Sequence, residues 1–193
     1  VKTIGKEAFS GCTKLKTAKL GGSVTSIGDK AFYKNTTLTS ISLPSKVSTI
    51  GKSAFEGCSM LSEVVIPDSV TVIGESVFKE CLLLSSVKMP NSVTWVGDNL
   101  FCNCASLQNV ELSENIEEIT YKMFENCTSL KEVTIPKSVS IIDNDAFYGC
   151  TSLENVVFQE GLCSIGNNAF SHCETLTSVT LPNSVEKLGT YVF

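Results

Sequence analysis

Arginine is absent from the 193-residue sequence, and all fifteen basic residues are lysines. The chain carries a formal net charge of −5, and it lacks both the guanidinium fork and the basic stripe with which proteins hold phosphates. We therefore expect no nucleic-acid partner. No apolar run approaches the roughly 18 residues of a membrane span, so no transmembrane segment is expected in this stretch.

Motifs that carry catalysis or hold a cofactor are also missing. The sequence contains no zinc-protease helix motif, no phosphate-binding loop and no dinucleotide fingerprint. The only histidine, His172, stands beside Cys173, but its position repeats as a Gly or Asn turn residue in other copies. We predict that the protein is not an enzyme and that it uses no cofactor or metal.

What the sequence does contain is a repeat, which the phenylalanines mark most clearly. Nine of the ten phenylalanines are spaced 23 residues apart, at Phe9, Phe32, Phe55, Phe78, Phe101, Phe124, Phe147, Phe170 and Phe193. Leucine, valine or isoleucine, and usually glycine recur at fixed distances from each of them, so that the second copy reads SVTSIGDKAFYKNTTLTSISLP. No insertion breaks the register, and residues 1–193 are predicted to form one domain of eight to nine repeats.

Each copy predicts a similar local structure. Leu38, Ile41 and Leu43 alternate with polar residues, as in a short half-buried strand that Pro44 ends. Residues 29–32 are predicted to form one helical turn. Gly or Asn stands two residues past the phenylalanine in five copies, where we expect a left-handed backbone.

A single copy cannot bury its apolar side, but stacked copies can cover one another. The predicted fold is therefore an α/β solenoid: a right-handed coil with short parallel strands on one face and short helical turns and extended segments elsewhere. The chain begins inside a repeat and stops at the phenylalanine position, so we expect a longer protein, or head-to-tail contacts between copies of this one.

The frame L-x-x-L-x-L-P followed by S-V-x-x-I-G-x-x-A-F-x-x-C resembles the BspA-type leucine-rich repeat along the whole chain. The resemblance is to surface and secreted proteins of oral and gut bacteria and of protists such as Trichomonas and Entamoeba. It implies a leucine-rich-repeat solenoid that binds host proteins or mediates adhesion, and it transfers no catalytic residue. Local departures include Asn35 for cysteine, Thr120 and Asp143 for glycine, and Ser113 for proline.

Seven of the nine cysteines also share one position in the repeat: Cys12, Cys58, Cys81, Cys104, Cys127, Cys150 and Cys173. A metal site needs ligands that converge on one point, whereas a fixed period spreads them along the solenoid. We predict a ladder of buried, reduced thiols. Disulfides between neighbouring coils are the alternative, because adjacent coils lie about 5 Å apart.

The outward strand positions vary between copies, and we expect any protein ligand to bind there. An exposed pair outside the strands, Val72 and Trp95, is either a further anchor or incidental. The candidate binding residues are Lys19, Ser42, Glu63, Val65, Lys88, Glu111, Glu132, Thr134, Val157, Thr180, Val72 and Trp95. A cell-surface or secreted location follows from the resemblance, and a cytoplasmic scaffold or self-associating array is the alternative.

Overall fold

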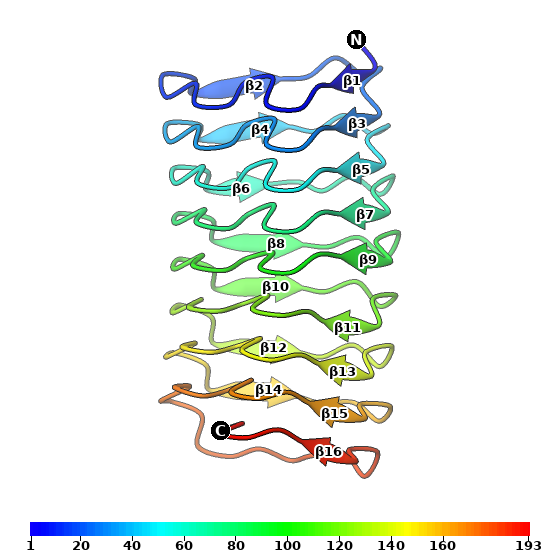
Figure 1. The fold of residues 1–193 in the computed structure, drawn as a ribbon, viewed down its shortest axis with the longest axis vertical. Coiled ribbons are helices and arrows are strands. Elements are labelled where there is room, and N and C mark those ends of the chain that lie inside the picture. Colours follow the sequence, from blue (N-terminus) through cyan, green and yellow to red (C-terminus); the bar gives the residue numbers. More distant parts are fainter.

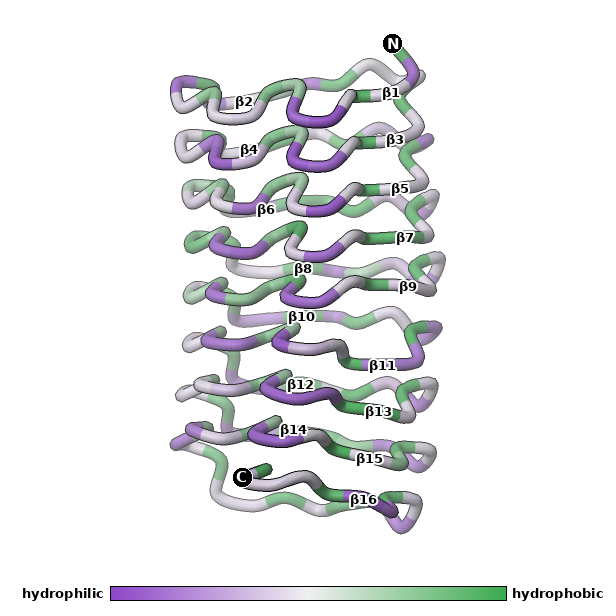
Figure 2. The backbone as a smooth tube through the Cα atoms, viewed as in Figure 1, coloured by the Kyte–Doolittle hydropathy of each residue, from purple (hydrophilic) through white to green (hydrophobic).

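The computed structural model describes all of residues 1–193 as a stack of coils that follow one another in sequence order, from the N-terminus at the top of Figure 1 to the last coil at the bottom. Each coil is one 23-residue repeat, and hydrophobic and hydrophilic segments recur at corresponding places in successive coils (Figure 2). The predicted solenoid is therefore confirmed. The structure contains no α-helix, so no helix is long and apolar enough to cross a membrane.

One series of strands, which we call the first face, follows the predicted position in the repeat. It consists of β2 (Thr17–Lys19), β4 (Ser40–Ser42), β6 (Glu63–Val64), β8 (Ser86–Lys88), β10 (Asn109–Glu111), β12 (Glu132–Thr134) and β14 (Asn155–Val157). Paired strands are parallel, and the partner of each residue lies 23 positions away, as with Thr17 and Ser40. The middle residue of each strand points into the core, while its neighbours are more exposed.

A second series of strands corrects the prediction that strands lie on one face only. This second face consists of β1 (Thr3–Ile4), β3 (Ser26–Ile27), β5 (Thr49–Ile50), β7 (Val72–Ile73), β9 (Trp95–Val96), β11 (Glu118–Ile119), β13 (Ile141–Ile142), β15 (Ser164–Ile165) and β16 (Lys187–Leu188). These segments were expected to be extended, but they also pair in parallel with the coils above and below. Pairing follows because stacking places their backbone donors and acceptors against those of the next coil.

The predicted helical turn at residues 29–32 is wrong, and hydrogen bonds between coils explain why. The amides of Lys30 and Phe32 donate to Lys52 and Ala54 of the next coil, both at 2.8 Å. The intervening amide of Ala31 closes a tight turn to the carbonyl of Gly28 at 3.2 Å. A four-residue helix would bear the full cost of nucleation, whereas this corner satisfies alternate donors across the stack. The left-handed positions are confirmed, as at Asn103 with φ 62°.

The core contains the predicted phenylalanine ladder. Every member from Phe32 to Phe170 is at most 1% exposed, and neighbouring rings stack with centroids 4.9–5.8 Å apart. Such offset stacking contributes about 0.5–1.5 kcal/mol per pair beyond the area that it buries. The ladder therefore adds aromatic stacking to the burial that holds successive coils together.

Both faces of the stack are interrupted at one boundary, which we call the seam. β9 does not pair with β11, and β10 does not pair with β12, so both faces break between the same two coils. At equivalent positions Ser140 N donates to Glu117 O at 2.9 Å, whereas Glu117 N makes no backbone bond to Thr94 O. The corner between the two faces stays bonded across the seam, because Phe101 N donates to Met123 O at 2.8 Å.

The glycine position accounts for the seam. A Cβ added to Gly74 would lie 2.7 Å from the amide nitrogen of Lys52, too close for any side chain, and Gly97 is similarly crowded. Thr120 brings a β-branched side chain to this position, and its hydroxyl donates to the Gly97 carbonyl at 3.1 Å. Its own amide makes no bond to the coil above. Asp143 also replaces glycine but keeps its amide bond to Ile119 O, so loss of the glycine does not by itself break the pairing.

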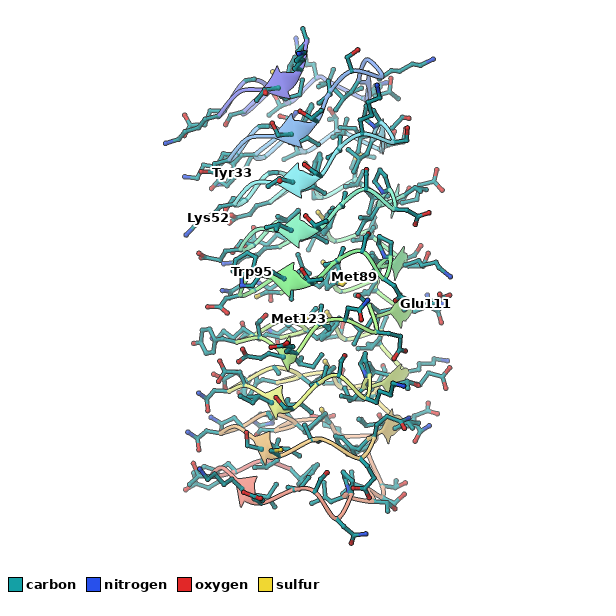
Figure 3. The ribbon with its side chains drawn as sticks, turned by 90° about the vertical axis from the view of Figure 1, so that its right-hand side faces the viewer. Tyr33, Lys52, Met89, Trp95, Glu111 and Met123 are labelled. Atoms are coloured by element: carbon teal, nitrogen blue, oxygen red, sulfur yellow. The ribbon has the colours of Figure 1, made fainter.

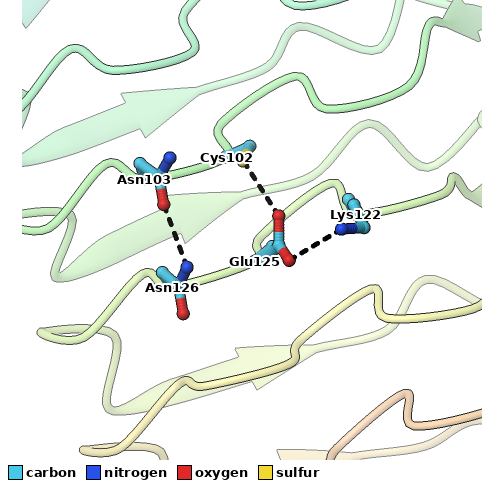
Figure 4. A network of polar contacts seen from close by, with 5 residues as sticks. All are labelled: Cys102, Asn103, Lys122, Glu125 and Asn126. Carbon is cyan, nitrogen blue, oxygen red and sulfur yellow. Dashed lines mark hydrogen bonds and ion pairs between the residues drawn. The ribbon is translucent and has the colours of Figure 1, made fainter.

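Side chains bridge the corner of the seam where the backbone ladder continues (Figure 4). Asn126 Nδ2 donates to Asn103 Oδ1 at 3.0 Å, and the thiol of Cys102 donates to Glu125 Oε2 at 3.2 Å. Lys122 Nζ lies 2.9 Å from the other oxygen of Glu125. These contacts hold the two coils together at one corner while both faces are open.

Candidate protein-binding surface

The outward side chains of the first face form the surface on which a ligand was expected. Its strands are two or three residues long, and the alternation of the strand directs every second side chain outward. Inward positions are apolar in every coil because their side chains are packed in the core. Outward positions vary in chemistry and include Val65, Lys88 and Glu111. Core packing therefore does not restrict the outward residues, and they can differ between coils to suit a ligand.

The structure places an open groove of about 950 Å³ on this face, over β8, β10, β12 and β14. It extends across the seam, because β10 and β12 belong to the coils that the seam separates. Its lining includes Lys88, Glu111, Glu132, Thr134 and Val157. Five of the predicted binding residues are thus brought together in one concavity.

The other predicted residues do not join the groove. Lys19, Ser42, Glu63, Val65 and Thr180 lie at the same repeat positions in coils beyond it, and all are exposed. Val72 and Trp95 lie elsewhere, as partners in β7 and β9 of the second face. Figure 3 shows Trp95 and Glu111 on opposite sides of the view. The predicted set is therefore divided between two separate surfaces.

The groove is acidic. Four carboxylates, those of Asp68, Glu111, Glu114 and Glu132, line it together with a single lysine, Lys88. Lys88 Nζ lies 2.6 Å from Glu111 Oε2, and the hydrogen bond to Glu111 raises the pKa of Lys88. Both side chains are well exposed, so solvent screens the pair and it stabilises the fold little. Either member of the pair can therefore leave its partner and pair with an opposite charge on a ligand.

Sequence reasoning missed part of the lining. Asp68, Asn91 and Glu114 belong to the bend that follows each strand of the first face, one residue after the proline position. Asn91 Oδ1 accepts the amide of Glu114 at 2.9 Å and ties two of these bends together. The sequence did contain one indication of these residues, because they share a repeat position that is polar in most copies. That position lies outside the strand.

The cysteine ladder is buried, as predicted, at its five central members, which are fully inaccessible. Each of these thiols donates to a phenylalanine carbonyl of the preceding coil, as Cys104 does to Phe78 at 3.1 Å. Burial raises the pKa of the Cys58 thiol to about 12. Cys12 is exposed at the start of the ladder, and every cysteine is a free thiol in the structure. These groups act as small apolar side chains rather than nucleophiles.

His172 and Cys173 do not form a nucleophile and base. His172 has a left-handed backbone with φ 61°, and its ring meets the ring of Tyr148 edge-on at 5.1 Å. The Cys173 thiol instead donates to the Phe147 carbonyl at 3.3 Å, and burial raises its pKa to about 12. His172 is therefore a turn residue, as its repeat position indicated.

The repeat and its coil geometry match a known family model, that of the BspA type leucine rich repeat region, over residues 1–104 and 71–193. The chain belongs to the BspA-type leucine-rich repeat family. Leucine-rich repeats are generally protein-interaction modules. No curated protein matches the chain significantly.

Solved structures of other leucine-rich repeat proteins share the fold. A leucine-rich repeat protein from Bacteroides ovatus is 34% identical over 100% of this chain and 50% of its own, with a TM-score of 0.95. A leucine-rich cell surface protein from Faecalibacterium prausnitzii is 31% identical over 98% of this chain and 57% of its own, with a TM-score of 0.62. The leucine-rich repeat protein of T. pallidum is 28% identical over 91% of this chain and 83% of its own, with a TM-score of 0.82. The chain thus spans about half the length of the Bacteroides ovatus protein.

Proposed function

We propose that the chain is a non-enzymatic protein-binding module that works at the cell surface or after secretion, in adhesion or in binding host proteins. The groove over β8, β10, β12 and β14 carries this proposal, because it is the large concavity on a face whose outward residues vary. Protein ligands need a surface of several coils to bury enough area for stable binding. The groove spans four coils and supplies such a surface.

The chemistry of the groove supports a protein ligand. Its lining mixes carboxylates, amides and a lysine with the apolar atoms of Pro90, Pro136 and Val157. Charged groups at such a surface set the rate and the selectivity of association more than its strength. The surface location rests on the similarity to the Faecalibacterium cell surface protein.

Binding of purified extracellular matrix proteins to immobilised protein, measured by surface plasmon resonance, tests the proposal. Glu132→Lys reverses a charge inside the groove, while Glu63→Lys makes the same change at the same repeat position outside it. We expect the first variant to weaken binding about tenfold and the second to leave it unchanged. Equal loss in both variants, or no binding to any matrix protein, would count against the groove.

A second candidate function is a self-associating repeat array. Phe9 and Phe193, at opposite ends of the phenylalanine stack, are 38% and 52% exposed. A hollow of about 320 Å³ beside Phe193 is lined by Phe170, Leu176 and Val179. Sedimentation of the 193-residue protein over a range of concentrations tests this candidate, because head-to-tail contact predicts a rising mean mass that Phe193→Lys reduces. A constant monomer mass at high concentration would rule it out.

A further inference from the structure

The second face carries an exposed patch that the groove does not use. We call it the tryptophan patch, and it consists of Val72, Trp95, Asp98, Glu118, Ile141 and Asp143. Trp95 is 54% exposed and Ile141 42% exposed, whereas most apolar residues of comparable size are in the core. Large apolar side chains left in solvent on a rigid face commonly mark a binding site.

Strand pairing fixes how the apolar members lie. Val72 pairs with Trp95 across β7 and β9, and Glu118 pairs with Ile141 across β11 and β13. The seam separates these two pairs, so β9 is the last strand of its sheet and Trp95 stands at that edge. Figure 3 shows Trp95 beside β9, on the side of the view away from Glu111.

The charges that act on the Asp98 and Glu118 carboxyls are all of one sign. Asp98 is exposed and Glu118 is half-buried, and partial loss of solvent around each carboxyl is the main cause that raises its pKa. Asp143 raises both pKa values further, and every other charge acting on the two carboxyls is also a carboxylate. Lys52 and Lys122 are engaged by Glu75 and Glu125. The patch therefore holds negative charge that no nearby lysine offsets.

We propose that the tryptophan patch is a second docking surface, which takes an extended lysine- or arginine-bearing segment of a partner protein. One cation of the segment stacks on the indole of Trp95, while a second pairs with Glu118 and Asp98 across the seam. The aliphatic stems of the same side chains cover Val72 and Ile141. Anionic membranes and nucleic acids are repelled by this charge, and the groove on the first face is not involved.

Trp95 is the only tryptophan in the chain, so intrinsic fluorescence reports on this patch alone. The probe is a blocked peptide of four Lys-Ser pairs, and the control probe is a peptide of four Gln-Ser pairs. At about 20 mM salt we expect the lysine peptide to shift the Trp95 emission saturably, and about 0.5 M salt to abolish the shift, because exposed charges are then screened. The glutamine peptide should leave the emission unchanged.

Two variants with the same change in charge locate the site. We expect Asp98→Asn with Glu118→Gln to weaken binding of the lysine peptide at least about tenfold. Glu111→Gln with Glu132→Gln alters only the groove and should not change binding of the lysine peptide. The test of the tryptophan patch is therefore independent of the proposal for the groove. Far-UV circular dichroism confirms that both variants fold.

The proposal is overturned if both double variants lose binding equally, because attraction to net charge would then explain it. It is also overturned if the lysine peptide leaves Trp95 emission unchanged at low salt. A saturable shift caused by a neutral glucose hexamer but not by the peptide would assign the patch to carbohydrate instead.

Discussion

Phe101 and Phe124 stack across the seam with ring centroids 5.5 Å apart and 19° between their planes. Every other neighbouring pair in the phenylalanine stack is tilted by only 5–11°. The largest tilt therefore coincides with the boundary at which both faces lose their strand pairing. The aromatic core stays continuous there, because the two rings remain stacked.

Thr120→Gly should close the seam. Glycine removes the β-branched side chain from this crowded position, and we expect the amide of residue 120 then to reach the Val96 carbonyl, as Gly97 reaches Ile73 at 2.9 Å in the preceding coil. We expect slower hydrogen exchange at residues 117 and 120. Asp143→Gly is the control, because its amide bond is already made. Unchanged exchange in the Thr120 variant would mean that another residue causes the seam.

Phe124→Ala should destabilise the protein by about 3–5 kcal/mol, because it removes a fully buried ring and opens a cavity in the ladder. Phe9→Ala should cost much less, since that ring is 38% exposed and stacks on one neighbour only. Urea unfolding followed by circular dichroism compares the two. Similar losses would show that the central and terminal coils are equally packed, contrary to the structure.

Iodoacetamide at pH 8 should modify the native protein at Cys12 and Cys163, which are exposed. The five central ladder thiols should resist, because burial shields them and raises their pKa, so that little thiolate forms. Peptide mass spectrometry identifies the labelled positions. After denaturation without reductant, all nine thiols should react, and a count near three would instead indicate disulfides between coils.

Alkaline pH should destabilise the fold. Burial raises the pKa of Cys58, Cys102 and Cys173 from 9.0 to about 12. A raised folded pKa means that the unfolded chain ionises first, so this stability is fully present below pH 9 and is lost between about pH 9 and 12. Urea midpoints in reductant should stay level from pH 7 to 8.5 and then fall. Cys58→Ala should reduce the fall of the urea midpoint with rising pH. An unchanged fall would assign the loss of stability to other ionisable groups.

The sequence by itself determined the period, the core and the chemistry of the ladders. Phe32, Leu38 and Ile50 recur at fixed spacing, and periodic apolar residues must face inward when coils stack. The left-handed turn at Gly11 and Asn126 also followed from residue type, because these residues tolerate a positive φ. Burial of the thiols followed in the same way, from a small apolar side chain at a core position.

Only the tertiary structure decided which backbone groups pair. The second face and the corner without a helix both depend on hydrogen bonds between residues 22 to 24 positions apart in neighbouring coils, as from Lys30 N to Lys52 O. Local patterns contain no information on such partners, so they favoured a helical turn. The seam could not be predicted from the sequence either. Thr120 and Asp143 both replace glycine at the same repeat position, yet only Thr120 loses its amide bond. The groove and the tryptophan patch arise where these coils meet, and packing between coils determined both.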